Sequence, residues 1–129
     1  MRYVLVLVAV LVFGATAAAA MELVMFRQAG CPWCAAWDRE VGPVYPKTEL
    51  GQGVPVRLVD LARARDTAGL KSPVRFTPTF VLFDGGREIG RIEGYPGQDF
   101  FWGLLENLVP KPAAADGVTR APRAQGVER

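Results

Sequence analysis

Short apolar runs, each bounded by turn-forming residues, dominate the hydrophobic pattern of the chain. The first is Leu23-Val24-Met25-Phe26, and its unbroken apolar character is typical of a strand that is buried on both faces of a sheet. Residues 54–60 predict a second strand, and residues 79–83, which directly follow Pro78, predict a third. We therefore expect these segments to form the centre of one sheet.

Helical spacing appears between and after the first two predicted strands. A helix is expected to begin at Cys31, with Pro32 in its first turn, where a missing N–H loses no hydrogen bond, and to end at Gly42-Pro43. The apolar residues of this helix recur on one face and predict an inward stripe: Cys34, Trp37 and Val41. A weaker amphipathic pattern predicts a second helix over residues 61–70.

The C-terminal part has the pattern of a hairpin followed by a helix. Asp84-Gly85-Gly86 predicts a tight turn, and residues 87–93 predict an edge strand with a bulge at Gly90. Five residues form the apolar face of the predicted closing helix: Phe100, Phe101, Leu104, Leu105 and Leu108. This order of elements predicts an α/β domain whose central mixed sheet has about four strands and is flanked by helices.

The two ends of the chain lack this pattern. Residues 1–20 contain one Arg, an apolar stretch and a run of small residues, which is the arrangement of a secretory signal peptide. An uncleaved anchor is the alternative, because the stretch is almost long enough to span a membrane. Residues 110–129 are expected to form a disordered tail, so we expect one folded domain over residues 21–109, outside the cytoplasm.

Charge and cysteine content narrow the function. The formal net charge is +2, and acidic and basic residues are mixed along the chain. The sequence therefore shows no basic cluster of the kind that binds nucleic acid or a strongly charged membrane surface. The chain has two cysteines, both in Cys31-Pro32-Trp33-Cys34. A disulfide between them would close too short a loop to add much stability through chain entropy. The pair is therefore poorly placed for a purely structural role.

These motifs together resemble the thioredoxin superfamily. Cys31-Pro32-Trp33-Cys34 follows the first buried strand and opens a helix, and Val74-Arg75-Phe76-Thr77-Pro78-Thr79 is similar to the family's segment around its cis-proline. Asp84-Gly85-Gly86 matches the family's hairpin, and Gly94 matches the glycine before its last helix. The resemblance covers residues 23–109 and implies the thioredoxin-like fold, a three-layer α/β sandwich.

The resemblance also implies roles at the dithiol. Cys31 is expected to be the nucleophile, because the helix dipole and nearby N–H groups favour its thiolate and lower its pKa below the free value of about 8.5. Cys34 is expected to be the resolving thiol. Trp33 is expected either to shield the sulfur atoms or to bind substrate. Thr77-Pro78 is expected to carry a cis peptide bond and to present the backbone of Thr77 to a substrate chain.

One position departs from the family pattern. Thioredoxins usually carry a buried Asp six residues before the nucleophile, which helps to deprotonate the resolving thiol; here Met25 stands there, and the chain has no histidine. Glu22 is a candidate for proton transfer and Arg75 for stabilising the Cys31 thiolate, and an exposed charge is the alternative for both. Asp60 is expected to be a turn or cap residue.

Three classes of function remain open. The first is a thiol–disulfide oxidoreductase without a cofactor, acting either as a reductant or as an oxidant of exported proteins. The second is a metal-handling module, because two thiolates can hold a soft ion, although no histidine or third cysteine is present. The third is a noncatalytic binding domain with a permanent disulfide.

A finer likeness within the family involves residues 27–38 and 42–48. Both segments look like the SoxS type of thioredoxin, which is found with bacterial sulfur-oxidation genes. This likeness implies a periplasmic location, a membrane thiol–disulfide electron donor, and a partner protein that is kept reduced, such as the carrier complex SoxYZ. We expect a monomer. For Tyr45-Pro46-Lys47-Thr48 a structural loop is the alternative interpretation.

Overall fold

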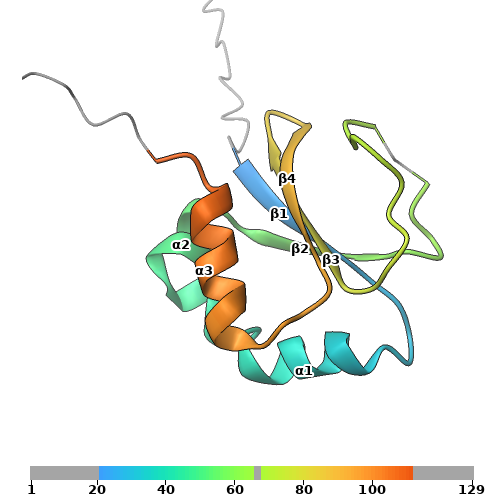
Figure 1. The fold of residues 1–129 in the computed structure, drawn as a ribbon, viewed down its shortest axis with the longest axis horizontal. Coiled ribbons are helices and arrows are strands. Elements are labelled where there is room, and N and C mark those ends of the chain that lie inside the picture. The colour runs from blue at the N-terminus through green and yellow to red at the C-terminus, as the bar shows by residue number, and fades with distance from the viewer. Residues whose placement is uncertain (1–20, 66–67, 112–129) are drawn as a thin grey trace, which may run out of the picture.

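The computed structural model describes residues 21–65 and 68–111 (Figure 1). Within them the strands are β1 (Met21–Arg27), β2 (Val56–Asp60), β3 (Thr79–Asp84) and β4 (Arg87–Glu93). The helical segments are α1 (Pro32–Glu40), the 3-10 turn η1 (Tyr45–Lys47), α2 (Glu49–Gly53) and α3 (Gln98–Leu108). None of these helices has the length and apolar character that crossing a membrane requires. The predicted signal peptide, residues 1–20, and residues 112–129 of the predicted tail lie outside the described residues.

The strands form one mixed sheet in the order β2-β1-β3-β4. β1 pairs with β2 in parallel and with β3 antiparallel, and β3 pairs with β4 antiparallel. The apolar run of β1 is buried throughout, as predicted for a strand in the middle of a sheet with both faces covered. The predicted α/β architecture, a four-stranded mixed sheet flanked by helices, is therefore confirmed.

One face of the sheet packs against α1 and α3, which lie on the same side of it in Figure 1. The predicted inward stripe of α1 is confirmed, because all three of its residues are buried: Cys34, Trp37 and Val41. The predicted face of α3 is partly wrong, because Phe101 and Leu105 are buried while Phe100 and Leu104 are exposed. A helix turns by about 100° per residue. When Phe101 and Leu105 face the sheet, Phe100 and Leu104 therefore point away from it.

The other face of the sheet is covered by the segment between β2 and β3, which runs as a loop at the right of Figure 1. The predicted helix over residues 61–70 is wrong, because the described residues 61–65 and 68–70 are not helical. Tertiary hydrogen bonds hold this backbone: Leu61 N–H donates to the Arg27 carbonyl at 2.7 Å, and Glu88 N–H to the Gly69 carbonyl at 2.9 Å. Gly69 has a φ of +80°, which a helix does not allow.

The segment after α1 forms a corner that sequence patterns missed, because η1 and α2 are too short to show periodicity. Tyr45 is fully buried and its hydroxyl donates to the Val54 carbonyl at 2.7 Å. This burial raises the pKa of Tyr45. Thr48 caps α2 by accepting from Gly51 N–H at 2.9 Å. Tyr45-Pro46-Lys47-Thr48 therefore forms η1 and the N-terminal cap of α2 in the structure.

β4 contains a bulge as predicted, but at Ile89 and not at Gly90. Leu82 of β3 lies opposite Gly90, but Phe83 lies opposite Glu88, so Ile89 is an extra residue without a partner. Glu88 is only 5% exposed, and it forms an ion pair with Arg91 in which Arg91 Nε donates to Glu88 Oε1 at 2.6 Å. Burial of a carboxylate is tolerated here because it is both paired and hydrogen-bonded.

The Glu88–Arg91 pair predicts an acid-sensitive contribution to stability. The hydrogen bond from Arg91 lowers the pKa of Glu88 below its ordinary value of 4.5, against the opposing effect of burial. A depressed folded-state pKa adds stability that is present above the unfolded value and is lost as pH falls through the folded value. We therefore expect the urea-unfolding free energy to fall more steeply in wild type than in Glu88→Gln between about pH 5.5 and pH 3. Equal slopes in the two proteins would contradict this assignment.

Candidate functional site: the dithiol at the start of α1

Cys31 and Cys34 form a disulfide across the first turn of α1, with their Cα atoms 5.3 Å apart. Cys31 is the N-cap residue with extended backbone, and Pro32 begins the helix, as predicted. The backbone N–H of Cys34 donates to Sγ of Cys31 at 3.2 Å. When the pair is reduced, a hydrogen bond of this kind and the positive end of the helix favour the thiolate of Cys31.

The two cysteines differ in exposure. Cys34 is 1% exposed and belongs to the core cluster beneath α1, whereas Cys31 is half-buried at the edge of this cluster. A disulfide of a partner can therefore approach Cys31 before Cys34. Trp33, between them, is 61% exposed, so most of its ring surface is open to a partner rather than packed in the core.

The loop before β3 lies at the same end of the sheet as the dithiol. Thr79 is opposite Phe26 in the β1–β3 register, so Pro78 lies next to the end of β1, from which the chain leads to Cys31. The Thr77-Pro78 peptide bond is cis, as predicted. Pro78 is buried and Thr77 half-buried. This end of the sheet therefore carries both the cysteine pair and the cis-proline.

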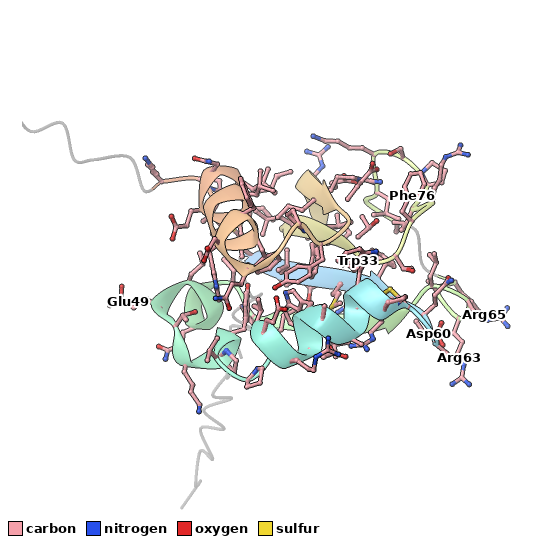
Figure 2. The ribbon with its side chains drawn as sticks, turned by 60° about the horizontal axis from the view of Figure 1, so that its bottom comes forward. Trp33, Glu49, Asp60, Arg63, Arg65 and Phe76 are labelled. Carbon is pink, nitrogen blue, oxygen red and sulfur yellow. A yellow bond between two sulfur atoms is a disulfide. The ribbon has the colours of Figure 1, made fainter. Side chains whose placement is uncertain are left out.

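Phe76, which has no local sequence signal beyond its place in the proline motif, is an exposed aromatic residue on this loop. It is 60% exposed, and Figure 2 shows it in the same half of the molecule as Trp33. Its carbonyl accepts a hydrogen bond from Thr79 Oγ1 at 2.7 Å, while the Pro78 carbonyl accepts from Gly94 N–H at 2.7 Å. The aromatic ring of Phe76 is therefore presented to solvent from an anchored backbone.

Two long-range contacts fix α1 to the rest of the domain. Arg27, the last residue of β1, donates from Nη1 to Asp38 Oδ1 at 2.7 Å and from Nη2 to Asp38 Oδ2 at 2.6 Å. The Tyr95 hydroxyl donates to Glu40 at 2.5 Å, and burial together with this bond raises the pKa of Tyr95. Sequence analysis missed both pairs, because no local pattern links residues so far apart. They hold the helix that carries the dithiol in one orientation.

The remaining candidates lie away from the sulfur atoms or on the surface. Glu22 lies at the end of β1 that is remote from the dithiol. It is about 16 Å from Arg27 at the other end, because a strand rises about 3.3 Å per residue. Its carboxylate pairs with Arg57 at 2.9 Å. Its candidate role in proton transfer to Cys34 is therefore wrong. Met25 is fully buried. Arg75 is exposed, and Asp60 accepts from Ala62 N–H at 2.9 Å as the predicted turn residue.

Residues 21–65 and 68–111 contain no group of three His, Cys, Asp or Glu side chains placed to hold a metal ion. Two cysteines on one helical turn, one accessible and one buried, can exchange electrons with a second disulfide without any cofactor. On a mixed sheet that also presents a cis-proline loop, this chemistry defines a thiol–disulfide oxidoreductase of the thioredoxin type. A family model described as a thioredoxin-like domain matches residues 15–108, and the chain belongs to this family.

Comparison with solved structures gives a finer likeness. The periplasmic thioredoxin SoxS from Paracoccus pantotrophus, in its reduced form, is 50% identical, with a TM-score of 0.64, and the match covers 68% of this chain and 94% of SoxS.

More distant thioredoxins share only the fold. Thioredoxin from Malassezia sympodialis is 24% identical, with a TM-score of 0.53 and coverage of 69% of this chain and 75% of that one. Thioredoxin from Fasciola hepatica is 21% identical, with a TM-score of 0.56 and coverage of 70% and 83%. No curated protein matches the chain at a significant level. The thioredoxin-like fold predicted from the sequence is therefore confirmed.

Proposed function

We propose that this protein is a periplasmic reductant that passes two electrons from Cys31 and Cys34 to a disulfide of a sulfur-oxidation partner such as SoxYZ. The observation that carries this proposal is the 50% identity to periplasmic SoxS over 94% of that protein. Residues 1–20 act in this proposal as a signal peptide that is cleaved after export. The folded domain then works as a monomer.

The proposed reaction is a two-step exchange. The thiolate of Cys31 attacks one sulfur of the partner disulfide, which forms a mixed disulfide and releases the first partner thiolate. The thiolate of Cys34 then attacks Sγ of Cys31, which breaks the mixed disulfide and releases the second partner thiolate. The partner gains two electrons and the protein is left with the Cys31–Cys34 disulfide, which a membrane dithiol donor reduces again. The greater exposure of Cys31 supports this order of attack.

Substrate binding in this proposal involves the surface around Cys31. Trp33 and Phe76 supply exposed aromatic surface, which favours a role in docking over a role in shielding the sulfur atoms. Thr77 presents its backbone to an extended segment of the partner, and Pro78 sets the direction of that backbone. These roles account for two large aromatic rings that the folded domain leaves in contact with water.

The direction of electron flow has a direct test. We expect the Cys31/Cys34 pair, equilibrated with defined thiol–disulfide buffers, to have a reduction potential near about −270 mV, the value typical of thioredoxin. At this potential the dithiol reduces disulfides of higher potential, such as strained, exposed or catalytic ones, and leaves most structural disulfides of exported proteins intact. A value near about −120 mV, as in DsbA, would make the protein an oxidant of exported proteins and would overturn the proposed direction.

The proposed partner is tested separately from the enzyme class. Reduced protein is mixed with SoxYZ that carries a disulfide, and free thiols on each chain are counted by mass spectrometry after acid quenching. We expect thiols to appear on SoxYZ as the Cys31–Cys34 disulfide forms, and Trp33→Ala to slow this transfer. Reduction of insulin without any reduction of SoxYZ would leave the enzyme class intact and would remove SoxYZ as the partner.

A further inference from the structure

The bulge in β4 brings two charged side chains onto one face of the sheet. Residues three apart in a regular strand point to opposite faces, because side chains alternate. The extra residue Ile89 changes this alternation, so that Glu88 lies opposite Phe83 and Arg91 opposite Val81. Both of these partners belong to the core cluster of the second face. The bulge thus makes the Glu88–Arg91 ion pair geometrically possible.

This ion pair bonds the backbone of the segment that leads into the proline loop. Glu88 Oε2 accepts from Lys71 N–H at 2.7 Å. Arg91 Nη2 donates to the Ser72 carbonyl at 2.8 Å, and Nη1 donates more weakly to the Pro73 carbonyl at 3.5 Å. The backbone of Glu88 adds a bond to Gly69. Residues 69–73 are therefore held on β4 by side-chain bonds from Glu88 and Arg91 and by one backbone bond, and not by a strand ladder or a helix.

The loop that follows, residues 74–78, is then held at both of its ends. At its start, Val74 packs on the second face of the sheet, directly after the carbonyl groups that Arg91 binds. At its end, the bonds from Thr79 and Gly94 to Phe76 and Pro78 fix the backbone. The exposed ring of Phe76 lies between these two anchors along the chain. Figure 2 labels Phe76 on this loop.

We propose that Glu88 and Arg91 are positioning residues for the substrate-binding loop, a role that rests on the proposed function. They act through residues 71–73 to hold Phe76 and the cis-proline in the orientation that a protein substrate meets. In the sheet, Glu88 lies opposite Phe83, and Phe83 lies opposite Glu22. Glu22 is at the end of β1 that is remote from Cys31, so Glu88 is also at that end of the sheet. The pair therefore influences substrate binding from a distance and leaves the chemistry of the two sulfur atoms unchanged.

Arg91→Lys tests this role because lysine keeps the charge but loses the planar fork that binds two carbonyl groups. Arg87→Lys, an exposed position on the same strand, is the matched control. With insulin as the protein disulfide, we expect Arg91→Lys to raise KM about tenfold while kcat stays within about twofold. The small disulfide dithiobis(nitrobenzoic acid), which needs no docking loop, should react at the wild-type rate, and the reduction potential should not change.

Hydrogen exchange supplies a readout that does not depend on activity. In Arg91→Lys, and in Glu88→Gln as a second variant, we expect the amides of Lys71 and Gly94, which donate to Glu88 Oε2 and to the Pro78 carbonyl, to exchange about tenfold faster than in Arg87→Lys. Amides of α1 should keep their wild-type exchange rates in Arg91→Lys. Acceleration in Arg91→Lys that is equal throughout the domain, or equal slowing with insulin and with the small disulfide, would show that the pair only stabilises the domain as a whole and would overturn the proposal.

The two proposals fail in different ways. If wild type reduces neither disulfide, the proposed function is wrong, while the exchange rates still decide whether Glu88 and Arg91 hold the loop. If wild type reduces insulin and Arg91→Lys does so with an unchanged KM, the positioning role is wrong and the proposed function stands.

Discussion

Cys31→Ser is expected to abolish disulfide reduction, lowering the rate with insulin by at least about a thousandfold, to background. The reason is that a serine hydroxyl stays protonated at neutral pH, whereas disulfide exchange requires a thiolate. Cys34→Ser is expected to perform the first attack but not the second, because Cys34 supplies the thiolate that releases the product. It should therefore accumulate a mixed disulfide between Cys31 and its partner.

Non-reducing electrophoresis followed by mass spectrometry distinguishes these two outcomes. Cys34→Ser should give a new species with the summed mass of the two proteins, which dithiothreitol separates, and Cys31→Ser should give none. The two variants serve as controls for each other, because each retains one thiol and removes the disulfide. If both trap the same species, or if neither does, the assignment of Cys31 as nucleophile and Cys34 as resolving thiol is contradicted.

The parts of the site that sequence analysis predicted are those with a local signal. The Cys31-Pro32-Trp33-Cys34 motif combines a helix-starting proline with an apolar stripe, so the helix and the unequal exposure of its cysteines follow from spacing alone. The apolar run of β1 and the Asp84-Gly85-Gly86 turn are equally local features, and both were predicted correctly. The cis bond at Pro78 required the family resemblance, because any X-Pro bond looks alike in the sequence.

The parts that were missed depend on residues far apart in the chain. The expected helix over residues 61–70 had apolar spacing, but bonds to Arg27 and Glu88 hold this segment in another conformation. The Arg27–Asp38 pair likewise gives no periodic pattern in the sequence from which it could be predicted. Glu88 and Arg91 could have been found, because a bulge at Gly90 was predicted and a bulge brings residues three apart onto one face.

Trp37→Ala is expected to cause a large loss of stability, lowering the free energy of unfolding of the oxidised protein by about 3–5 kcal/mol. Trp37 is 2% exposed and is the residue through which α1 contacts the aromatic core. Its ring centroid lies 5.7 Å from that of Phe80, 6.1 Å from that of Phe101 and 6.2 Å from that of Tyr45. Removing it leaves a cavity between the helix and the sheet, which a rigid core fills only in part. Urea unfolding measures the loss.

Trp37→Phe is the matched control, because it keeps an aromatic ring and deletes the indole N–H, which has no hydrogen-bond partner among the described residues. A buried unpaired donor costs about 1–3 kcal/mol, so its removal offsets part of the lost packing, and we expect a loss of only about 1–2 kcal/mol. Since Cys34 shares this core cluster, Trp37→Ala should also speed alkylation of reduced Cys34 relative to Trp37→Phe. Equal losses of stability and equal alkylation rates in the two variants would show that Trp37 does not anchor the dithiol helix.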